Sequence, residues 1–384
     1  MLGTVQGLIG WVPLGLPAFL FVITVVVFFH ELGHFAVGRC CGVAVETFSI
    51  GFGPAIVKWH DRKGTLWKIS WVPLGGYVKF LGDADAASTP DHAQMETMGS
   101  EEREHALPFR PLYQRALVVL AGPVANFILA IVIFAALFMT VGRPQLSSHG
   151  IAPRVGTVTP GSPAAVAGLK PNDLISAVNG QPIRNFEQLQ KSVQASHGKT
   201  LAFSVKRKNG SAILYGTPRW ITIQDIYGSN TKLFGIGVSP AADPNSITMV
   251  RLGPLESVGA AGVQTWQIVD TTLTYVWRIV SGRSDTHQLS GPVGIARISQ
   301  KAASEGFLNL VGLAALISVS IGLINLFPIP ILDGGHLLYY GCEAVLGRPL
   351  GARAQEVGFR LGLALVLGLF VLATWNDLVR PSLF

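Results

Sequence analysis

Four apolar segments, at residues 13–37, 116–141, 307–331 and 361–375, constrain this chain more than any other feature. A helix needs about 20 apolar residues to cross a bilayer. The first three segments reach that length, and the fourth is short, so we expect its helix to extend past its charged neighbours. Only 13% of the residues are charged and the mean hydropathy is +0.44, as in membrane proteins. We therefore predict a polytopic α-helical membrane protein with about four transmembrane helices.

Lysine and arginine residues set the expected orientation. None precedes residue 13, whereas many lie between residues 38 and 115. Because basic loops stay in the cytoplasm, we predict that residues 38–115 are cytoplasmic and that the N-terminus is outside. The first segment lacks a basic n-region and an A-x-A cleavage site, so we expect it to be retained. The basic residues are spread over loops, so the formal net charge of +7 indicates contact with the lipid bilayer and no nucleic-acid partner.

A metal-binding motif closes the first apolar segment, where residues 30–34 read HELGH. On a helix, positions four apart share a face, so His30 and His34 can bind one zinc ion while Glu31 reaches the bound water. Ionisable groups are costly at membrane depth, which makes these three residues functional candidates. A solvated helix is the plain alternative, but the preceding residues 24–29 (TVVVFF) leave no polar face for it.

A third ligand is expected, because catalytic zinc usually takes three protein ligands and keeps one position for water. Residues 325–335 (NLFPIPILDGG) offer Asp333, the first acidic residue after an uncharged stretch that begins at Gly306. Pro328 and Pro330 would break the helix just before it. His336 is the main rival as a ligand, and a simple helix-ending turn at Asp333 is the plain alternative.

The loop after the first segment has two kinds of composition. Residues 46–54 and 67–81 have the pattern of short strands joined by Gly and Pro turns. Apolar strands beside a membrane can dip into it only as a protein-buried, re-entrant segment, or else lie at its surface. Residues 83–105 are polar and predict a mobile loop, in which His92 and His105 are solvated.

An α/β module follows the second apolar segment. Residues 155–183 alternate strand, turn and helix signals and end at Asn179-Gly180, a strong hairpin signal. The module resembles a PDZ domain over about residues 154–240, in a single copy. PDZ domains bind an extended peptide along a sheet edge and hold its terminal carboxylate with loop amides. The resemblance places this peptide groove at Arg154, Val155, Gly156 and Thr157.

Six motifs occur in a characteristic order: HELGH at 30–34, FSIGFGP at 48–54, PLGGYVKFLGD at 73–83, AGPVANF at 121–127, SGPVGIA at 290–296 and NLFPIPILDGG at 325–335. Together they resemble the site-2 proteases, which are intramembrane zinc metalloproteases, and in particular the bacterial RseP-like group that regulates sigma-E. The resemblance covers almost the whole chain. Close relatives often carry tandem PDZ domains, whereas this chain shows one, so a size filter built from two domains is not expected here.

The resemblance implies one zinc ion per chain on His30, His34 and Asp333, with Glu31 as general base. Asn325 matches an asparagine that helps position the substrate or transition state. A re-entrant β segment that binds substrate as an added strand is matched by Gly75, Gly76, Tyr77, Val78, Lys79 and Phe80. The implied substrates are membrane-spanning proteins such as anti-sigma factors, and remnant signal peptides. The implied location is the bacterial inner membrane, with the PDZ domain extracytoplasmic.

The predicted organisation has six parts. Residues 1–37 form the first transmembrane helix, 38–115 the cytoplasmic loop with the re-entrant β segment, 116–142 the second transmembrane helix, 143–240 the PDZ domain, 241–305 a connector, and 306–384 the third and fourth transmembrane helices. Within the connector, residues 264–280 are either an interfacial amphipathic helix, with Trp266, Tyr275 and Trp277 at the lipid headgroups, or a packed linker helix.

Two other functions remain as alternatives. An ion or proton transporter would also place ionisable residues in the membrane, but it predicts inverted repeats, and the sequence shows none. A membrane-anchored PDZ scaffold with a non-catalytic metal site predicts the loss of a ligand or of the base, and all of these residues are present. We therefore predict an intramembrane zinc metalloendopeptidase that performs regulated intramembrane proteolysis, with the scaffold as the second hypothesis.

Overall fold

The computed structural model describes residues 12–83, 92–147, 150–207, 210–224, 230–241, 246–282 and 290–379. The chain divides into two compact units. The helical unit comprises Met1–Leu137, Pro254–Thr274 and His287–Phe384. The α/β unit comprises Phe138–Gly253 and Tyr275–Thr286.

Four helices among the described residues are long and apolar enough to cross a membrane. They are α2 (Val12–Cys40), α5 (Leu112–Thr140), α10 (Phe307–Asn325) and α12 (Ala352–Val379). The four predicted spans are therefore present as helices, with two differences in their bounds. The third ends at Asn325 rather than at 331, because the residue before a proline disfavours helical geometry and Pro328 and Pro330 follow. The fourth is longer than its apolar core, as expected, and takes in Arg360, which pairs with Glu356 one turn away.

The helices of the helical unit pack through small and branched side chains. Helices in lipid gain little from apolar burial and associate by close packing of this kind. One buried cluster joins α2 to α10 through Ala18, Val22, Val26, Leu310, Ala314 and Ile317. In addition, α9 (Pro292–Glu305) is tied to α12, because the backbone N–H of Gly294 donates to the carboxylate of Asp377 at 2.8 Å. The buried cluster fixes the position of α2 against α10, and the Gly294–Asp377 hydrogen bond fixes α9 against α12.

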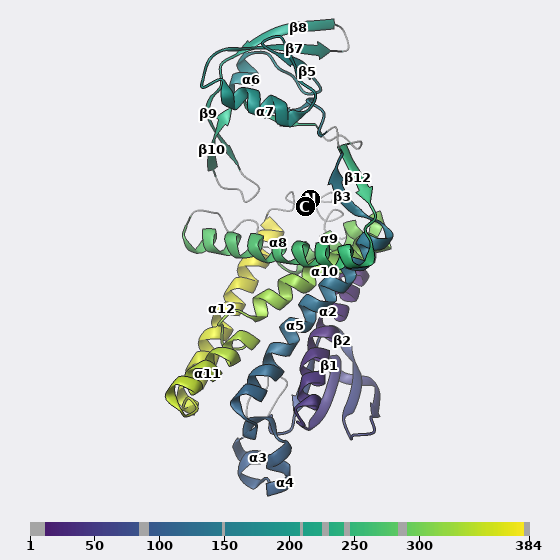
Figure 1. Cartoon of the computed structure of the whole chain (residues 1–384). Helices are drawn as coiled ribbons and strands as arrows, with labels where there is room; N and C mark the ends of the chain where they lie inside the picture. The colour runs from purple at the N-terminus through teal and green to yellow at the C-terminus, as the bar shows by residue number, and fades with distance from the viewer. Residues whose placement is uncertain are drawn as a thin grey trace. The chain divides into compact units, whose positions relative to one another are not determined.

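Helix α8 (Pro254–Val280) lies across one end of this bundle (Figure 1). Ile268 and Val269 on its inner side pack against a buried cluster of Ala130, Ala315 and Val319. Trp266 and Trp277 are 68% and 66% exposed. A helix is thus present where residues 264–280 predicted one, and it begins earlier. Its contact with lipid headgroups stays a prediction.

A curled β-sheet packs against α2 at the other end of the unit. Its strands, β1 (Val45–His60) and β2 (Leu66–Phe80), are much longer than the short strands expected from the sequence. Each strand bends and pairs twice: Phe48 pairs with both Val78 and Trp67, and Trp67 also pairs with Trp59. The sheet therefore has four segments, and residues 55–60 and 76–80 form its two edges. Phe48 is fully buried and stacks on Trp67 at 4.3 Å.

Residues 92–105, within the segment 83–105 predicted to be a mobile loop, form ordered helices. Residues 84–91 lie outside the described residues, but α3 (His92–Thr97), α4 (Ser100–His105) and the 3₁₀ helix η1 (Leu107–Phe109) follow. The mobile-loop prediction is therefore wrong for 92–105. Glu102 caps the first turn of α4 by accepting from the Gly99 N–H, a local interaction that composition does not reveal. The exposed His105 ring lies 3.0 Å from the Gly42 carbonyl oxygen, as suits a non-ligand.

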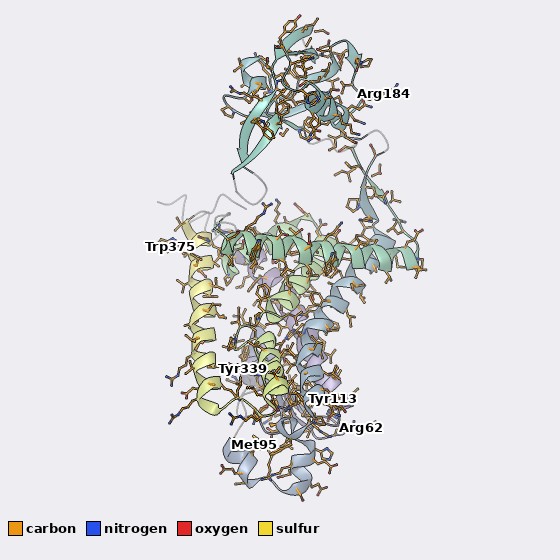
Figure 2. All side chains as sticks on the ribbon, turned by 60° about the vertical axis from the view of Figure 1, so that its left-hand side comes forward. Arg62, Met95, Tyr113, Arg184, Tyr339 and Trp375 are labelled. Carbon is orange, nitrogen blue, oxygen red and sulfur yellow. The ribbon has the colours of Figure 1, made fainter. Side chains whose placement is uncertain are left out.

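The ends of the helical unit carry different elements. Arg62, Met95 and Tyr113 lie at one end of the bundle, where α2 finishes and α5 starts, and Trp375 lies at the other (Figure 2). Helix α11 (Asp333–Leu346) follows α10 after a break at 326–332. A bidentate ion pair between Arg115 and Glu343, at 2.5 and 3.1 Å, joins α5 to α11.

The α/β unit contains a four-stranded sheet in the order β6–β5–β7–β8. Its strands are β5 (Leu174–Val178), β6 (Gln181–Pro182), β7 (Leu201–Arg207) and β8 (Gly210–Gly216), covered by α6 (Pro163–Val166) and α7 (Phe186–Ala195). Asn179 and Gly180, with φ of 50° and 81°, make the predicted hairpin turn between β5 and β6. Ile175, Leu189 and Phe203 lie in the core of the unit.

Three further strand pairs complete the α/β unit. They are β3 (Arg143–Leu146) with β12 (Ile247–Val250), β4 (Val155–Val158) with β11 (Val238–Pro240), and β9 (Arg219–Gln224) with β10 (Asn230–Gly235). Arg207 and the buried Asp173 form an ion pair at 2.8 Å that joins β7 to the start of β5. Burial raises the pKa of Asp173, but hydrogen bonds from Arg207 and from the Lys170 backbone outweigh it and hold the pKa below its usual value.

Candidate metal centre

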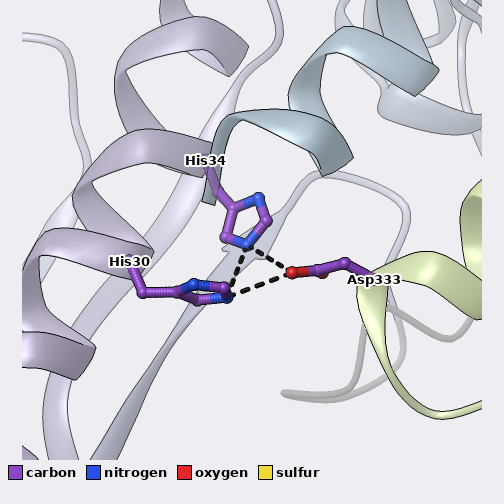
Figure 3. A group of neighbouring side chains, drawn as sticks. All are labelled: His30, His34 and Asp333. Carbon is purple, nitrogen blue, oxygen red and sulfur yellow. Dashed lines mark hydrogen bonds and ion pairs between the residues drawn. The ribbon is translucent and has the colours of Figure 1, made fainter. Parts of the chain in front are cut away.

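Two imidazoles and one carboxylate converge inside the helical unit (Figure 3). His30 and His34 project from one face of α2, and Asp333 is the first residue of α11. The Nε2 atoms of the two histidines are 3.2 Å apart, and they lie 3.1 and 3.5 Å from Asp333 Oδ2. The three side chains are between 9 and 17% exposed. His30 lies about 15 Å from the end of α2 at 1.5 Å per residue, well inside the span.

These spacings suit a zinc ion. Ligand atoms 2.0–2.1 Å from a tetrahedral zinc are about 3.3 Å from one another, close to the three distances found. Asp333 Oδ2 is buried, and apart from the two imidazoles it has no polar partner among the described residues. The donor set of two imidazoles and one carboxylate is that of known catalytic zinc sites.

Helix α5 orients both imidazole rings. The Nδ1 of His34 lies 2.8 Å from the Val118 carbonyl oxygen, and the Nδ1 of His30 lies 3.2 Å from the side-chain amide of Asn126. Since a carbonyl can only accept, His34 donates through Nδ1 and its Nε2 keeps a lone pair for a metal. Neither Val118 nor Asn126 was singled out from the sequence as a site residue. The polar Asn126 within an apolar helix was the available signal.

Glycines let α5 reach the two histidines. A Cβ on Gly122 would lie 2.5 Å from His34 Cε1 and 2.9 Å from His30 Cε1. A Cβ on Gly33, inside the HELGH motif, would lie 2.7 Å from the Cβ of Ala125 on α5. Real Cβ atoms essentially never approach this closely. The helices can therefore cross at this level only with glycine at both positions.

A tight loop presents Asp333. Ile331 has a φ of 100°, which a β-branched residue rarely adopts, so the backbone is strained two residues before the carboxylate. A Cβ on Gly335 would lie 2.5 Å from the Ile329 carbonyl oxygen. Gly334 and Gly335 are buried against the backbone of the same loop. Close backbone packing thus holds the start of α11 in place.

Glu31 lies between the metal centre and the edge of the sheet. It neighbours His30 in sequence, and its carboxylate is hydrogen-bonded by the Val78 backbone. The Cβ position of Gly76 is 3.5 Å from Glu31 Cγ. The predicted substrate segment, residues 75–80, therefore has its outer edge at the predicted base, while its inner edge pairs with residues 45–50.

Two other predicted residues lie outside the three-residue cluster. Asn325 ends α10 and is half-buried, and in the described part of the chain its side chain makes no hydrogen bond. His336, the rival ligand, is on the first turn of α11 and does not belong to the group of ligand atoms within 4.8 Å of one another. Burial lowers the pKa of His336 and favours its neutral form.

Strand β4 of the α/β unit, at the predicted peptide groove, is paired along one edge. Val155 is fully buried, and the Thr157 N–H is bonded to the Ser239 hydroxyl at 3.1 Å. Strand β11 pairs with β4 along this side, and Gly156 packs on the backbone of Pro240. Arg154 makes a bridge to Leu174 on the other side. Strand β11 therefore occupies one edge of β4, and peptide binding at 154–157 stays a prediction for the other edge.

The fold and the site together define a class of protein, namely metallopeptidases whose HExxH helix and distant carboxylate meet inside a membrane-spanning bundle. The family model of peptidase family M50 matches residues 18–369. A candidate zinc metalloprotease of Rhizobium meliloti is 43% identical over 94% of this chain and 96% of its own length. Metalloprotease MmpA of Caulobacter vibrioides is 39% identical over 96% of both chains.

A solved structure, the PDZ domain of an SdrC-like protein from Listeria monocytogenes, covers 25% of this chain and 92% of its own, with 20% identity and a TM-score of 0.19. The family match extends over most of the chain and includes His30, His34 and Asp333. The chain therefore belongs to peptidase family M50, the site-2 protease family, and is a zinc metalloprotease. This confirms the family and the enzyme class predicted from the sequence.

Proposed function

We propose that this protein cleaves single-span membrane proteins within the bilayer, with one zinc ion held by His30, His34 and Asp333. One observation carries the proposal. Three buried ligand atoms, from segments about 300 residues apart, lie at the spacing that tetrahedral zinc requires. When bound, zinc supplies a Lewis acid that activates water and polarises a carbonyl.

Glu31 is the proposed general base. It follows His30 directly, so its carboxylate lies beside the ligands without being one of them. It would take a proton from the attacking water and pass it to the leaving amine. The contact with the Val78 backbone fixes the carboxylate between the metal ligands and the sheet edge.

The outer edge of residues 75–80 is the proposed substrate site. A helical carbonyl is hydrogen-bonded within its helix, so a substrate must be unwound before hydrolysis. Pairing with a free strand edge would hold it extended and satisfy its backbone groups in a water-poor site. The approach of Gly76 and Val78 to Glu31 supports this proposal, because a strand added at this edge would lie next to the proposed base. Asn325, near the end of α10, is proposed to position the substrate from the opposite side of the break before α11.

The proposed location is the bacterial inner membrane, with residues 38–115 in the cytoplasm and the PDZ-like unit outside. The distribution of Lys and Arg supports this orientation. Membrane-spanning anti-sigma factors and remnant signal peptides are the proposed substrates. A C-terminal carboxylate is the proposed ligand of the PDZ-like unit, at a position other than the covered edge of β4.

The test uses a model single-span substrate in liposomes, with cleavage and zinc content measured on the same samples of full-length protein. Glu31→Gln should keep zinc and lose cleavage, because only the proton carrier is removed. Asp333→Ala should lose both. Glu356→Gln is the matched control, since this glutamate is exposed on α12 and pairs only with Arg360 in the described structure.

The outcomes separate the two functions. Cleavage by wild type and control only, with zinc absent from Asp333→Ala alone, supports the protease. Zinc bound equally by all four proteins with no cleavage by any would contradict it and favour the scaffold with a non-catalytic metal site. A zinc-free wild type would contradict the ligand assignment itself.

A further inference from the structure

Asn126 is the one polar side chain of α5 that faces the metal centre, and its amide is only half satisfied. The residue is fully buried, and its Nδ2 lies 3.2 Å from His30 Nδ1. Its Oδ1 is also buried and has no hydrogen-bond partner among the described residues. An unsatisfied buried acceptor costs about 1–3 kcal/mol, so this oxygen calls for a donor.

The chemistry of His30 supplies that donor. A histidine that binds metal through Nε2 carries its proton on Nδ1. The Nδ1–H then needs an acceptor, and the NH₂ group of Asn126 cannot be one. A half-turn of the amide about its last side-chain torsion exchanges Oδ1 and Nδ2 with almost no change in shape. After that turn Oδ1 accepts the Nδ1–H of His30, and the NH₂ group takes the position that Oδ1 leaves.

His34 provides an internal precedent. Its Nδ1 lies 2.8 Å from the Val118 carbonyl oxygen, which is an acceptor only. Val118 and Asn126 are eight residues apart on α5, about 2.2 turns, so they lie on the same side of the helix, about 80° apart. His30 and His34 are likewise one turn apart on α2. One face of α5 thus offers one acceptor to each imidazole.

We propose that Asn126 is a positioning residue whose amide oxygen accepts the Nδ1–H of His30 and thereby keeps Nε2 free to bind zinc. The inference rests on the proposed function, because it takes His30 as a ligand. Asn126 touches neither substrate nor reacting atoms and acts through the tautomer and orientation of the ring.

Helix α10 holds Asn126 in place for this role. The Ser318 hydroxyl donates to the Asn126 backbone carbonyl oxygen at 2.8 Å, and Ser318 is fully buried. A Cβ on Gly322 would lie 3.1 Å from the Cβ of Asn126. The backbone and the Cβ of Asn126 are therefore fixed by α10, and the amide keeps only the half-turn as its freedom.

The experiment measures the dissociation constant of zinc, by chelator competition, in full-length protein carrying Asn126→Asp or Asn126→Leu. Aspartate is nearly isosteric and can only accept, so Asn126→Asp should bind zinc at least as tightly as wild type. Leucine has a similar size and no acceptor, so Asn126→Leu should bind about 10–100-fold more weakly, the usual effect of losing such a partner. Ser320→Ala is the control, because its hydroxyl donates to the Leu316 carbonyl oxygen within α10 and its loss leaves the contact with Asn126 in place; its zinc affinity should match wild type.

Visible spectra of the cobalt(II)-loaded proteins give a second readout, because band positions and intensities report ligand geometry. Equal zinc affinity of wild type and Asn126→Leu overturns the inference and leaves the protease proposal standing. Weaker binding by Asn126→Asp also overturns it, because the amide would then act as a donor, and this arm is informative even if the leucine variant does not fold. Wild-type protein that binds no zinc overturns the ligand assignment and the inference together.

Discussion

Replacing Gly122 with alanine tests the close approach of α5 to the metal ligands. The new methyl group would lie 2.5 Å from His34 Cε1 and 2.9 Å from His30 Cε1, whereas ordinary contacts begin at 3.4 Å. The nearest atom is His34 Nε2, the proposed ligand atom, which lies closer still, so the ring of His34 must retreat by at least about 0.9 Å. Metal–ligand distances tolerate only about 0.2 Å. We expect zinc affinity to fall by at least about 10–100-fold, the range seen when ligand orientation is disturbed.

Gly122→Ala should change the stability of the fold less than it changes zinc affinity, because two contributions to stability oppose each other. Alanine in place of glycine favours a helix by about 1 kcal/mol, while overpacking costs about 1–3 kcal/mol. The net loss should be between about 0 and 2 kcal/mol, so the variant should fold and its zinc affinity can be measured. Gly259→Ala on α8 is the matched control, because its Cβ would meet nothing within 4 Å.

The assay is a zinc titration by chelator competition on wild type, Gly122→Ala and Gly259→Ala in the same detergent, with thermal unfolding recorded for each. The reasoning predicts weak binding in Gly122→Ala alone. If Gly122→Ala binds zinc as tightly as the control and unfolds at the same temperature, then α5 does not pack on the imidazoles in the way described, and the argument from glycine is refuted.

Two further predictions concern stability. The pKa of Asp173 is held below its ordinary value of about 3.9 in the folded protein. The pairing of Asp173 with Arg207 therefore stabilises the α/β unit above that pH. This stabilisation is lost as the pH falls through the lower pKa of the folded state. Hydrogen exchange of β5 and β7 should therefore accelerate below about pH 4 in wild type and show a flatter pH dependence in Asp173→Asn; parallel profiles would contradict this. Phe48→Ala should destabilise the helical unit by about 3–5 kcal/mol, because Phe48 is fully buried and stacked on Trp67. Chemical unfolding measures this cost, and a loss under 1 kcal/mol would show that the sheet is loosely packed on α2.

Much of the helical unit could be predicted because its signals are local. Apolar length gives the spanning helices, and the four-residue spacing of His30 and His34 gives their shared face. The end of α10 was missed by six residues because an apolar run continues past the helix into the proline-containing loop. Helices α3 and α4 were missed because polar composition alone does not distinguish a solvated helix from a coil.

The remaining features depend on contacts between distant segments. No sequence pattern marks the Val118 carbonyl as an acceptor, since every residue has one. The double pairing of Phe48 and Trp67 arises from bends in the strands, and alternation of side chains does not encode a bend. In the same way, the pairing of β4 with β11 joins residues about 80 positions apart, and no local pattern marks which edge of β4 it covers.

The separation of the proposed ligands along the chain has a consequence for biosynthesis. His30 and His34 enter the membrane with the first helix, and their acceptors on α5 follow some 90 residues later. Asp333 comes about 300 residues after His30, and at roughly 5–20 residues per second this takes about 15–60 s. Until then a nascent chain has two histidines and a glutamate but no third ligand. With these ligands, the metal site would be complete only after Asp333 has been synthesised, so the chain would gain its peptidase activity late in its own synthesis.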